Sequence, residues 1–158
     1  MPSFVCCNCN CLQKFKFRDL RYLDKEMFLC SSDCLFEQIT RRGFVNAALP
    51  GCICKVNLGR ASERYSPLLD KFFRSSYEQY FAETAYHRGL EFLYEELGFV
   101  LPSGAQYVPD FYFPWYSVFV EVKGAWRIGA KKKVKEFREA FPTLPLLVAH
   151  WRMKGDFY

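Results

Sequence analysis

The hydrophobic pattern is clearest in the second half of the chain. Apolar residues recur at helical spacing over residues 67–89, which predicts an amphipathic helix with Gly89 at its end. Strand-like apolar runs follow over residues 90–101, 107–113 and 117–123. A second helix is expected over 129–141 and a last apolar strand over 144–151. The predicted order is αβββαβ, and we expect the last strand to pair in parallel through the crossover helix.

Two of the strand-like runs are expected to be irregular. The first run is long and is expected to contain a bulge, and Pro109 places the second run at a sheet edge or a bulge. The short sequence PWY, at residues 114–116, is expected to turn the chain between the second and third runs. The second and third runs therefore form a predicted hairpin.

The first half of the chain has a different composition. All eight cysteines lie between Cys6 and Cys54, and none follows. This change predicts two modules: a cysteine-rich module over 1–54 and an α/β domain over 68–158, joined by a polar linker over 55–67.

Two close cysteine pairs indicate a metal site. Cys6 and Cys9 are separated by two residues, and Cys30 and Cys34 by three. Pairs with this spacing, about 20 residues apart, are typical of a tetrahedral Cys₄ zinc site, and the Zn²⁺ would supply folding energy to a segment too small to own a core. The segment MFLCSSDCLFEQI also resembles the second half of a treble-clef finger of the MYM/TRASH kind, in which the last cysteines open a helix.

Other cysteines leave the ligand set open. Cys7 and Cys11 crowd the first pair and remain alternative ligands. Cys52 and Cys54 would either bind a second zinc ion or be ordinary buried cysteines, since cysteine is among the most buried residue types.

Composition narrows the class of protein. With 51% hydrophobic and 19% aromatic residues, the 158-residue chain can bury a substantial core, and its net charge of +5 favours a polyanionic partner. No stretch of 18 apolar residues and no signal-peptide pattern is present, so we expect no membrane span, a cytoplasmic and non-secreted protein, and reduced cysteines.

Three charged residues interrupt the predicted hairpin. Alternate residues of a strand share a face, so Glu121 and Lys123 point away from the neighbouring valines, and the turn brings Asp110 beside Glu121. Two converging carboxylates suit Mg²⁺ (or Mn²⁺), and an adjacent lysine can orient the attacking water. This set predicts metal-assisted phosphodiester hydrolysis. The alternative is a solvent-facing pair on an amphipathic strand, worth little energetically.

Together these residues read PD…EVK, from Pro109 and Asp110 to Glu121, Val122 and Lys123. This pattern resembles the signature of the PD-(D/E)xK, or restriction-endonuclease-like, nuclease superfamily, whose core also has the order αβββαβ. The resemblance implies an α/β fold with that core, Mg²⁺ held by Asp110 and Glu121, and Lys123 positioning the water. It also implies cleavage of DNA.

One more carboxylate enters through the preceding helix. The segment FRSSYEQYF resembles the opening helix of phage and transposition-related members of the superfamily, where a glutamate is often found; here it is Glu78. Ser75 and Glu78 also have the spacing of a capping box, and the two roles are compatible. Glu95 or Glu96 could join the site from the first strand.

Four lysines of the second predicted helix could follow a DNA backbone or form its solvated face. They are Lys131, Lys132, Lys133 and Lys135. His150 is expected to be a packed core histidine, and no serine-nucleophile, zinc-protease or P-loop motif is present.

The sequence therefore predicts a Mg²⁺-dependent endodeoxyribonuclease with a structural Zn²⁺ module, of phage or mobile-element type, in the bacterial host cell if phage-encoded. One site per chain cuts one strand per visit, so double-strand cleavage would require a homodimer. The alternative is a nuclease-like fold that binds DNA, or a recombination or transcription partner, without cutting.

Overall fold

A computed structural model describes residues 1–17, 20, 23–45, 47–49, 52–54, 64–124 and 126–150; for 52–54 it describes the backbone alone. The fold is mixed α/β, with several small sheets and, within these ranges, three helices. Most of the expected linker, residues 55–63, lies outside the described residues. None of the helices in these ranges is long and apolar enough to cross a membrane.

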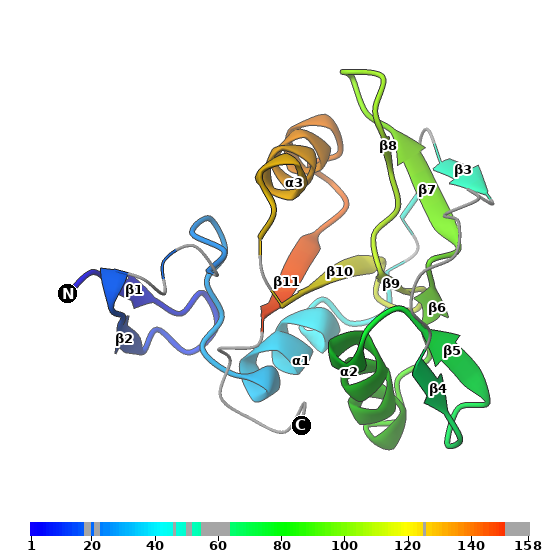
Figure 1. Cartoon of the computed structure of the whole chain (residues 1–158), viewed down its shortest axis with the longest axis horizontal. Helices are drawn as coiled ribbons and strands as arrows, with labels where there is room; N and C mark the ends of the chain where they lie inside the picture. The colour runs from blue at the N-terminus through cyan, green and yellow to red at the C-terminus, as the bar shows by residue number, and fades with distance from the viewer. Residues whose placement is uncertain are drawn as a thin grey trace.

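The described elements follow one another along the chain as labelled in Figure 1. They are β1 (Ser3–Val5), β2 (Leu12–Lys14), α1 (Ser32–Thr40), β3 (Cys52–Cys54), β4 (Arg64–Ser66), β5 (Lys71–Phe73), α2 (Ser76–His87), β6 (Leu93–Tyr94), β7 (Leu97–Val100), β8 (Gln106–Tyr107), β9 (Phe111–Phe113), β10 (Val118–Lys123), α3 (Ile128–Ala140) and β11 (Leu146–His150).

A four-stranded sheet in the order β11-β10-β9-β6 forms the centre of the fold. Strands β9 and β10 make the expected hairpin, and β11 pairs with β10 in parallel after the crossover helix α3, which confirms the predicted pairing. Figure 1 shows α3 on one side of this sheet and α1 with α2 on the other. The sheet is therefore covered on both faces, as its nearly all-apolar inner strands require.

The period-two pattern of β10 separates its side chains as predicted. Val118 and Val120 belong to the buried cluster on the side of α1 and α2. Phe119 belongs to the second cluster, with Val134 and Phe137 of α3. Because strand residues alternate between faces, Glu121 and Lys123 follow Phe119 onto the α3 side.

The helix expected over 67–89 begins later than the hydrophobic pattern indicates. Residues 64–73 instead form the hairpin β4–β5, in which Tyr65 lies opposite Phe72 with ring centroids 5.0 Å apart. Asp70 has a φ of 49°, a left-handed conformation that aspartate tolerates in turns. Cross-strand aromatic packing and this turn are the reasons why the first apolar residues of the segment are not helical.

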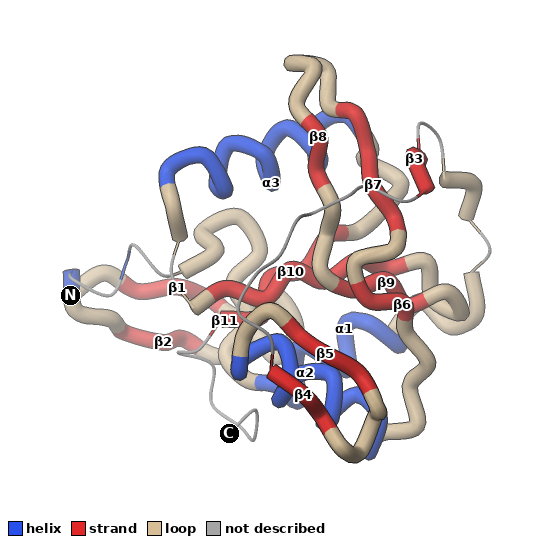
Figure 2. The backbone as a smooth tube through the Cα atoms, turned by 45° about the vertical axis from the view of Figure 1, so that its right-hand side comes forward, coloured by secondary structure: helices blue, strands red, loops and turns tan. Residues whose placement is uncertain are grey.

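The two irregular runs are interrupted more strongly than a bulge would require. At Glu95 the backbone φ is 50°, and there the first run divides into β6 and β7. Strand β6 pairs with β9 in the central sheet, whereas β7 joins β3 and β8 in a separate three-stranded sheet. The second run divides around Pro109 into β8 and β9. Figure 2 shows the β7–β8 hairpin extending beside α3.

The cysteine-rich segment packs against the α/β elements. Leu29 and Leu35 lie in the same buried cluster as Phe81 of α2 and Leu147 of β11. The cysteine-rich segment and the face of the central sheet therefore share one continuous hydrophobic core.

A buried ion pair makes a second connection. Asp24, which lies between the two cysteine pairs, accepts hydrogen bonds from Nη1 and Nη2 of Arg138 on α3 at 3.1 and 2.7 Å. Arg138 also donates to the Leu146 carbonyl of β11 at 2.6 Å. This bidentate arrangement attaches the loop around Asp24 to both α3 and β11.

His150 is a core residue, as expected. Its side chain is 3% exposed and its ring stacks on Phe28, with centroids 6.2 Å apart. Within the described part of the chain, neither ring nitrogen has a hydrogen-bond partner. Burial lowers the pKa of His150 to about 4, although the charge of Asp24 acts in the opposite direction.

This histidine is expected to make the fold acid-sensitive. Because its folded-state pKa is depressed, its favourable contribution is complete above the unfolded pKa of 6.5 and is lost as pH falls towards about 4. The loss would be about 1.4 kcal/mol per pH unit, or about 3 kcal/mol in all. Urea unfolding measured between pH 7 and pH 4 should show a smaller loss of unfolding free energy per pH unit for His150→Phe than for the wild type. His87→Phe, at an exposed position, should keep the wild-type dependence of unfolding free energy on pH. The same dependence in His150→Phe would show that His150 is not the cause of the acid sensitivity.

Candidate metal centre and acidic cleft

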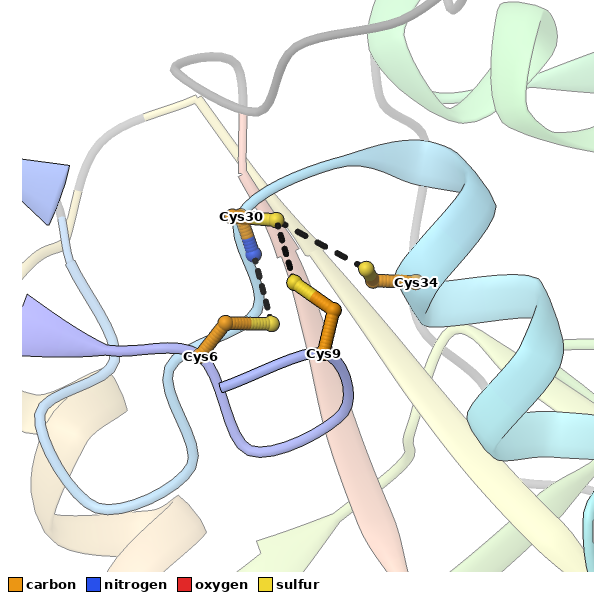
Figure 3. A group of neighbouring side chains, drawn as sticks. All are labelled: Cys6, Cys9, Cys30 and Cys34. Carbon is orange, nitrogen blue, oxygen red and sulfur yellow. Dashed lines mark hydrogen bonds between the residues drawn. The ribbon is translucent and has the colours of Figure 1, made fainter. Parts of the chain in front are cut away.

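Four cysteines come together at the start of α1. The sulfur atoms of Cys6, Cys9, Cys30 and Cys34 all lie within 4.8 Å of one another, and Figure 3 shows them pointing into a common space. The Cys9–Cys30 and Cys30–Cys34 sulfur distances are both 3.6 Å. A tetrahedral ion with metal–sulfur distances near 2.3 Å has sulfur–sulfur distances of about 3.8 Å, so these four cysteines could bind a metal such as zinc.

Local structure positions the second cysteine pair. Ser31 is the N-cap of α1, and its hydroxyl accepts a hydrogen bond from the Cys34 amide at 3.2 Å. Cys34 therefore lies in the first turn of a helix, as the finger-like segment predicts.

The pKa values of two thiols in this cluster shift in opposite directions. Burial opposes ionisation of Cys6, but backbone hydrogen bonds from Cys9, Asn8 and Cys30 outweigh it and lower its pKa to about 6. Burial and the neighbouring sulfurs raise the pKa of Cys30. A shared set of thiols with one member ready to ionise suits a metal that binds thiolates.

The remaining cysteines are arranged differently. Cys7 is exposed and its amide donates to the Phe28 carbonyl at 2.8 Å, while Cys11 accepts a contact from Gln13 at 3.6 Å. Neither belongs to the group of four. The question of a second site at Cys52 and Cys54 falls on side chains outside the described residues.

A second cluster forms where α2 meets the ends of β6 and β9. Oxygen atoms of Glu78, Glu95 and Asp110 lie within 4.8 Å of one another. Asp110 immediately precedes β9, and its Oδ2 accepts a hydrogen bond from the Val122 amide of β10 at 2.7 Å. This bond attaches the carboxylate to the strand that carries Glu121 and Lys123.

Burial and neighbouring negative charge raise the proton affinity of Asp110 and Glu78. The pKa of Asp110 lies well above its usual range, first because of burial and then because of the charges of Glu121 and Glu78. Burial likewise raises the pKa of Glu78, against hydrogen bonds from Tyr94 and Ser75. Among the described residues, neither Asp110 nor Glu78 forms an ion pair with a lysine or arginine. A bound cation would relieve this repulsion.

Glu78 lies in the first turn of α2, next to the helix cap that its spacing from Ser75 predicts. Ser75 is the N-cap of α2, and its hydroxyl accepts from the Glu78 amide at 3.2 Å. The same hydroxyl lies 3.1 Å from a carboxylate oxygen of Glu78. The cap thus holds the helix end so that the carboxylate reaches Asp110.

Glu121 lies beside this cluster but directs its oxygens elsewhere. Its side chain forms an ion pair with Lys123 and accepts a hydrogen bond from the Tyr107 hydroxyl at 2.9 Å. Burial lowers the pKa of Lys123, but Glu121 and Asp110 raise it more, so the net shift is upward and the ammonium form is favoured. Asp110, Glu121 and Lys123 are therefore neighbours. The carboxylates that lie within 4.8 Å of Asp110 and of one another are those of Glu78 and Glu95, whereas Glu121 was expected in this position.

A cleft of ≈ 470 Å³ opens beside these residues. Glu95, Glu121 and Tyr107 contribute to its lining. Its basic lining residues are Arg74, Lys123, Arg127 and Lys133. Acidic groups next to a basic rim can hold a cation and attract a phosphate at the same place.

The four lysines of α3 are not equivalent. Lys133 lines the cleft and donates to the Gln106 carbonyl at 3.1 Å. Lys131 lies on another side of the helix, 5.8 Å from the ring centroid of Trp126. Lys132 is exposed, and Lys135 is 3.9 Å from Glu139 in an i,i+4 pair.

Several residues that contact the carboxylates in and beside the cleft were not predicted from the sequence. Arg74 forms an ion pair with Glu95 at 2.8 Å, and Tyr94 and Tyr107 each donate to a carboxylate. A tyrosine in an otherwise apolar strand needs a hydrogen-bond partner for its hydroxyl. The two tyrosines could therefore have been predicted to lie near polar acceptors. Glu96 is exposed and outside the cluster.

Comparisons with protein-family models, with curated proteins and with solved structures found no match to this chain.

Proposed function

We propose that this chain is a divalent-metal-dependent endonuclease that hydrolyses phosphodiester bonds in DNA. The observation that best supports this function is the meeting of Asp110, Glu78 and Glu121 with Lys123 beside a basic cleft. Asp110 and Glu78 have no ion pair with a lysine or arginine among the described residues, which favours a metal, and the basic rim favours an anionic substrate. The resemblance to the PD-(D/E)xK superfamily rests on the same residues.

Hard oxygen ligands fit Mg²⁺ or Mn²⁺. Asp110 would be the central ligand, because it interacts electrostatically with both Glu78 and Glu121. Glu121 would be the second ligand, and Glu78 or Glu95 would supply a further oxygen. When bound, the cation would polarise a phosphate oxygen and stabilise the charge that develops during hydrolysis.

The chain's own residues would prepare the attack. Lys123, whose ammonium form is favoured by Glu121 and Asp110, would orient the water or neutralise charge at the phosphate. Tyr107 would keep the Glu121 carboxylate in place through its hydrogen bond. Arg74, Arg127 and Lys133 would bind the DNA backbone along the cleft.

The Cys₄ centre would hold a structural Zn²⁺. Its contribution would be to stability, since the segment shares its core with α2 and β11. A homodimer would allow both DNA strands to be cut.

One observation favours the second candidate, a DNA-binding protein that does not cut. Glu121 is already neutralised by Lys123 and hydrogen-bonded by Tyr107, so one expected metal ligand is occupied within the chain. In that case Glu78, Glu95 and Asp110 would form only an internal proton-sharing cluster.

Nicking of supercoiled plasmid distinguishes the two functions. The protein should be purified without chelator, so that the cysteine centre keeps its metal, and assayed with Mg²⁺, Mn²⁺, Ca²⁺ or no added divalent ion. Cleavage is expected with Mg²⁺ or Mn²⁺, and no cleavage is expected with Ca²⁺ or without an added divalent ion. Absence of cleavage on plasmid, linear, branched and single-stranded DNA, together with retained DNA binding, would favour the second candidate.

A further inference from the structure

A second cavity, which the proposed hydrolysis does not use, lies on the other side of the start of α3. It measures ≈ 260 Å³ and is lined by Trp126, Lys25, Lys131 and the Asp24–Arg138 pair, among others. This volume is below the range of about 300–1,000 Å³ of typical small-molecule sites, so it suits a group of the size of one base.

The cavity has an excess of positive charge. Asp24 and Glu26 both lie within ion-pair distance of Arg138, at 2.7 and 3.5 Å. Lys25 and Lys131, by contrast, form no ion pair within the described part of the chain. Burial and then the charge of Lys25 lower the pKa of Lys131, while the charge of Asp24 acts in the opposite direction; Lys25 and Lys131 both line the cavity. An anion between them would be stabilised by both.

Trp126 connects this cavity to the acidic cleft. The Nζ of Lys123, which lines the cleft, lies 5.9 Å from the Trp126 ring centroid, and the Nζ of Lys131 lies 5.8 Å from it. The indole ring that lines the cavity is therefore also close to Lys123 of the cleft. A DNA strand with a phosphate at Lys123 would bring a neighbouring nucleotide to Trp126.

We propose that this cavity binds one unpaired nucleotide of the DNA strand, with its base stacked on Trp126 and its phosphate between Lys25 and Lys131. The site needs an aromatic platform and converging cations, which are the two elements of single-strand recognition. A base stacked inside a duplex cannot reach the ring without leaving its partner. The protein would therefore prefer single strands, flaps or frayed ends to intact duplex. The inference rests on the DNA-binding part of the proposed function and not on cleavage.

Lys25 gives the cysteine-rich segment a direct part in this site. It lies between the two cysteine pairs, next to Asp24, which Arg138 holds against α3. The metal centre would thus help to place one wall of the nucleotide site.

Binding measured without cleavage tests the proposal. Asp110→Asn protein, prepared without chelator, would be titrated with a labelled single-stranded oligonucleotide and with a blunt duplex of the same sequence. Adding Trp126→Leu should weaken single-strand binding by about 5- to 150-fold, because stacking contributes about 1–3 kcal/mol per base. The single-strand affinity of Trp126→Phe should lie between those of the parent protein and Trp126→Leu. The affinity for the duplex should be the same in all three proteins.

Two further measurements keep the test independent of the stability of the leucine variant. Lys25→Gln should reduce the slope of log K against log salt for single strands by about 0.7, whereas Lys132→Gln, which lines neither cavity, should preserve the single-strand preference. Single strands should quench the tryptophan fluorescence of the parent protein but not of Trp126→Phe.

Equal single-strand affinity in the parent and both Trp126 variants would overturn the proposal, as would equal losses on single strand and duplex. Trp126-dependent binding without any plasmid cleavage would keep the nucleotide site and reject the nuclease. Plasmid cleavage together with unchanged single-strand affinity in both Trp126 variants would keep the nuclease and reject the nucleotide site.

Discussion

Asp110→Asn is expected to abolish magnesium-dependent DNA cleavage while leaving the fold at least as stable as the wild type. The asparagine keeps an oxygen that can accept from the Val122 amide, but it removes the charge that a divalent cation needs. We expect the cleavage rate to fall by at least about 10²–10³-fold, the usual effect of losing one electrostatic group of an active site. Plasmid nicking in Mg²⁺ measures it.

The stability part of this prediction follows from the raised pKa of Asp110. A folded-state pKa above the ordinary value means that its contribution to stability is present at low pH and is lost as pH rises, so the ionised group costs stability at neutral pH. Removal of the charge should therefore raise the melting temperature at neutral pH, or leave it unchanged. The difference should shrink as the pH is lowered towards the ordinary carboxyl range.

Matched variants define the control. Glu96→Gln changes an exposed carboxylate outside the cluster and should cut normally. Lys123→Gln should be nearly as inactive as Asp110→Asn. Wild-type cutting by Asp110→Asn would show that the observed cleavage does not come from this site, and a large fall in its melting temperature would show that the carboxylate is structural.

Loss of the metal from the cysteine centre is expected to unfold the whole described core and not only the segment that binds it. Structural zinc contributes about 10–16 kcal/mol of apparent binding energy, whereas a domain has only about 5–15 kcal/mol of total stability. Cys34 lies in the first turn of α1, and the cluster that contains Leu35 extends to Phe81 and Leu147. Cys34→Ser should therefore lower metal content and melting temperature together, with loss of the near-ultraviolet circular dichroism signal.

The neighbouring thiol provides the control for this prediction. Cys7→Ser replaces an exposed cysteine outside the group of four and should keep both the metal and the melting temperature. Measurement of one zinc ion per chain, released by thiol modification, would identify the metal. A Cys34→Ser protein that melts like the wild type would show that the four thiols do not stabilise the fold through a metal.

Local pattern predicted much of this structure because local physics decides it. The alternation of Val118, Phe119 and Val120 places Glu121 and Lys123 on one face whatever the rest of the fold does. The cap at Ser75 and the cysteine spacing around Cys34 are also local, and both agree with the structure.

The prediction of secondary structure was wrong where the same apolar residues fit both the helical and the strand periodicity. Phe72 and Phe73 fit the helical spacing of the following segment, but a strand is formed because Tyr65 pairs with Phe72 across a turn. The left-handed backbone at Glu95 is likewise invisible in residue type, and it divides one expected strand between two sheets.

The amino-acid order sets which carboxylates and thiols are present and which face of each strand or helix carries them. Their partners follow from the folded arrangement: Glu95 beside Asp110, Tyr107 and Lys123 on Glu121, and Lys25 in the same cavity as Trp126. Secondary-structure period fixes the direction of a side chain within a few residues. The partner depends on strand pairing and helix packing between distant segments, and the free energies that select them belong to the whole core.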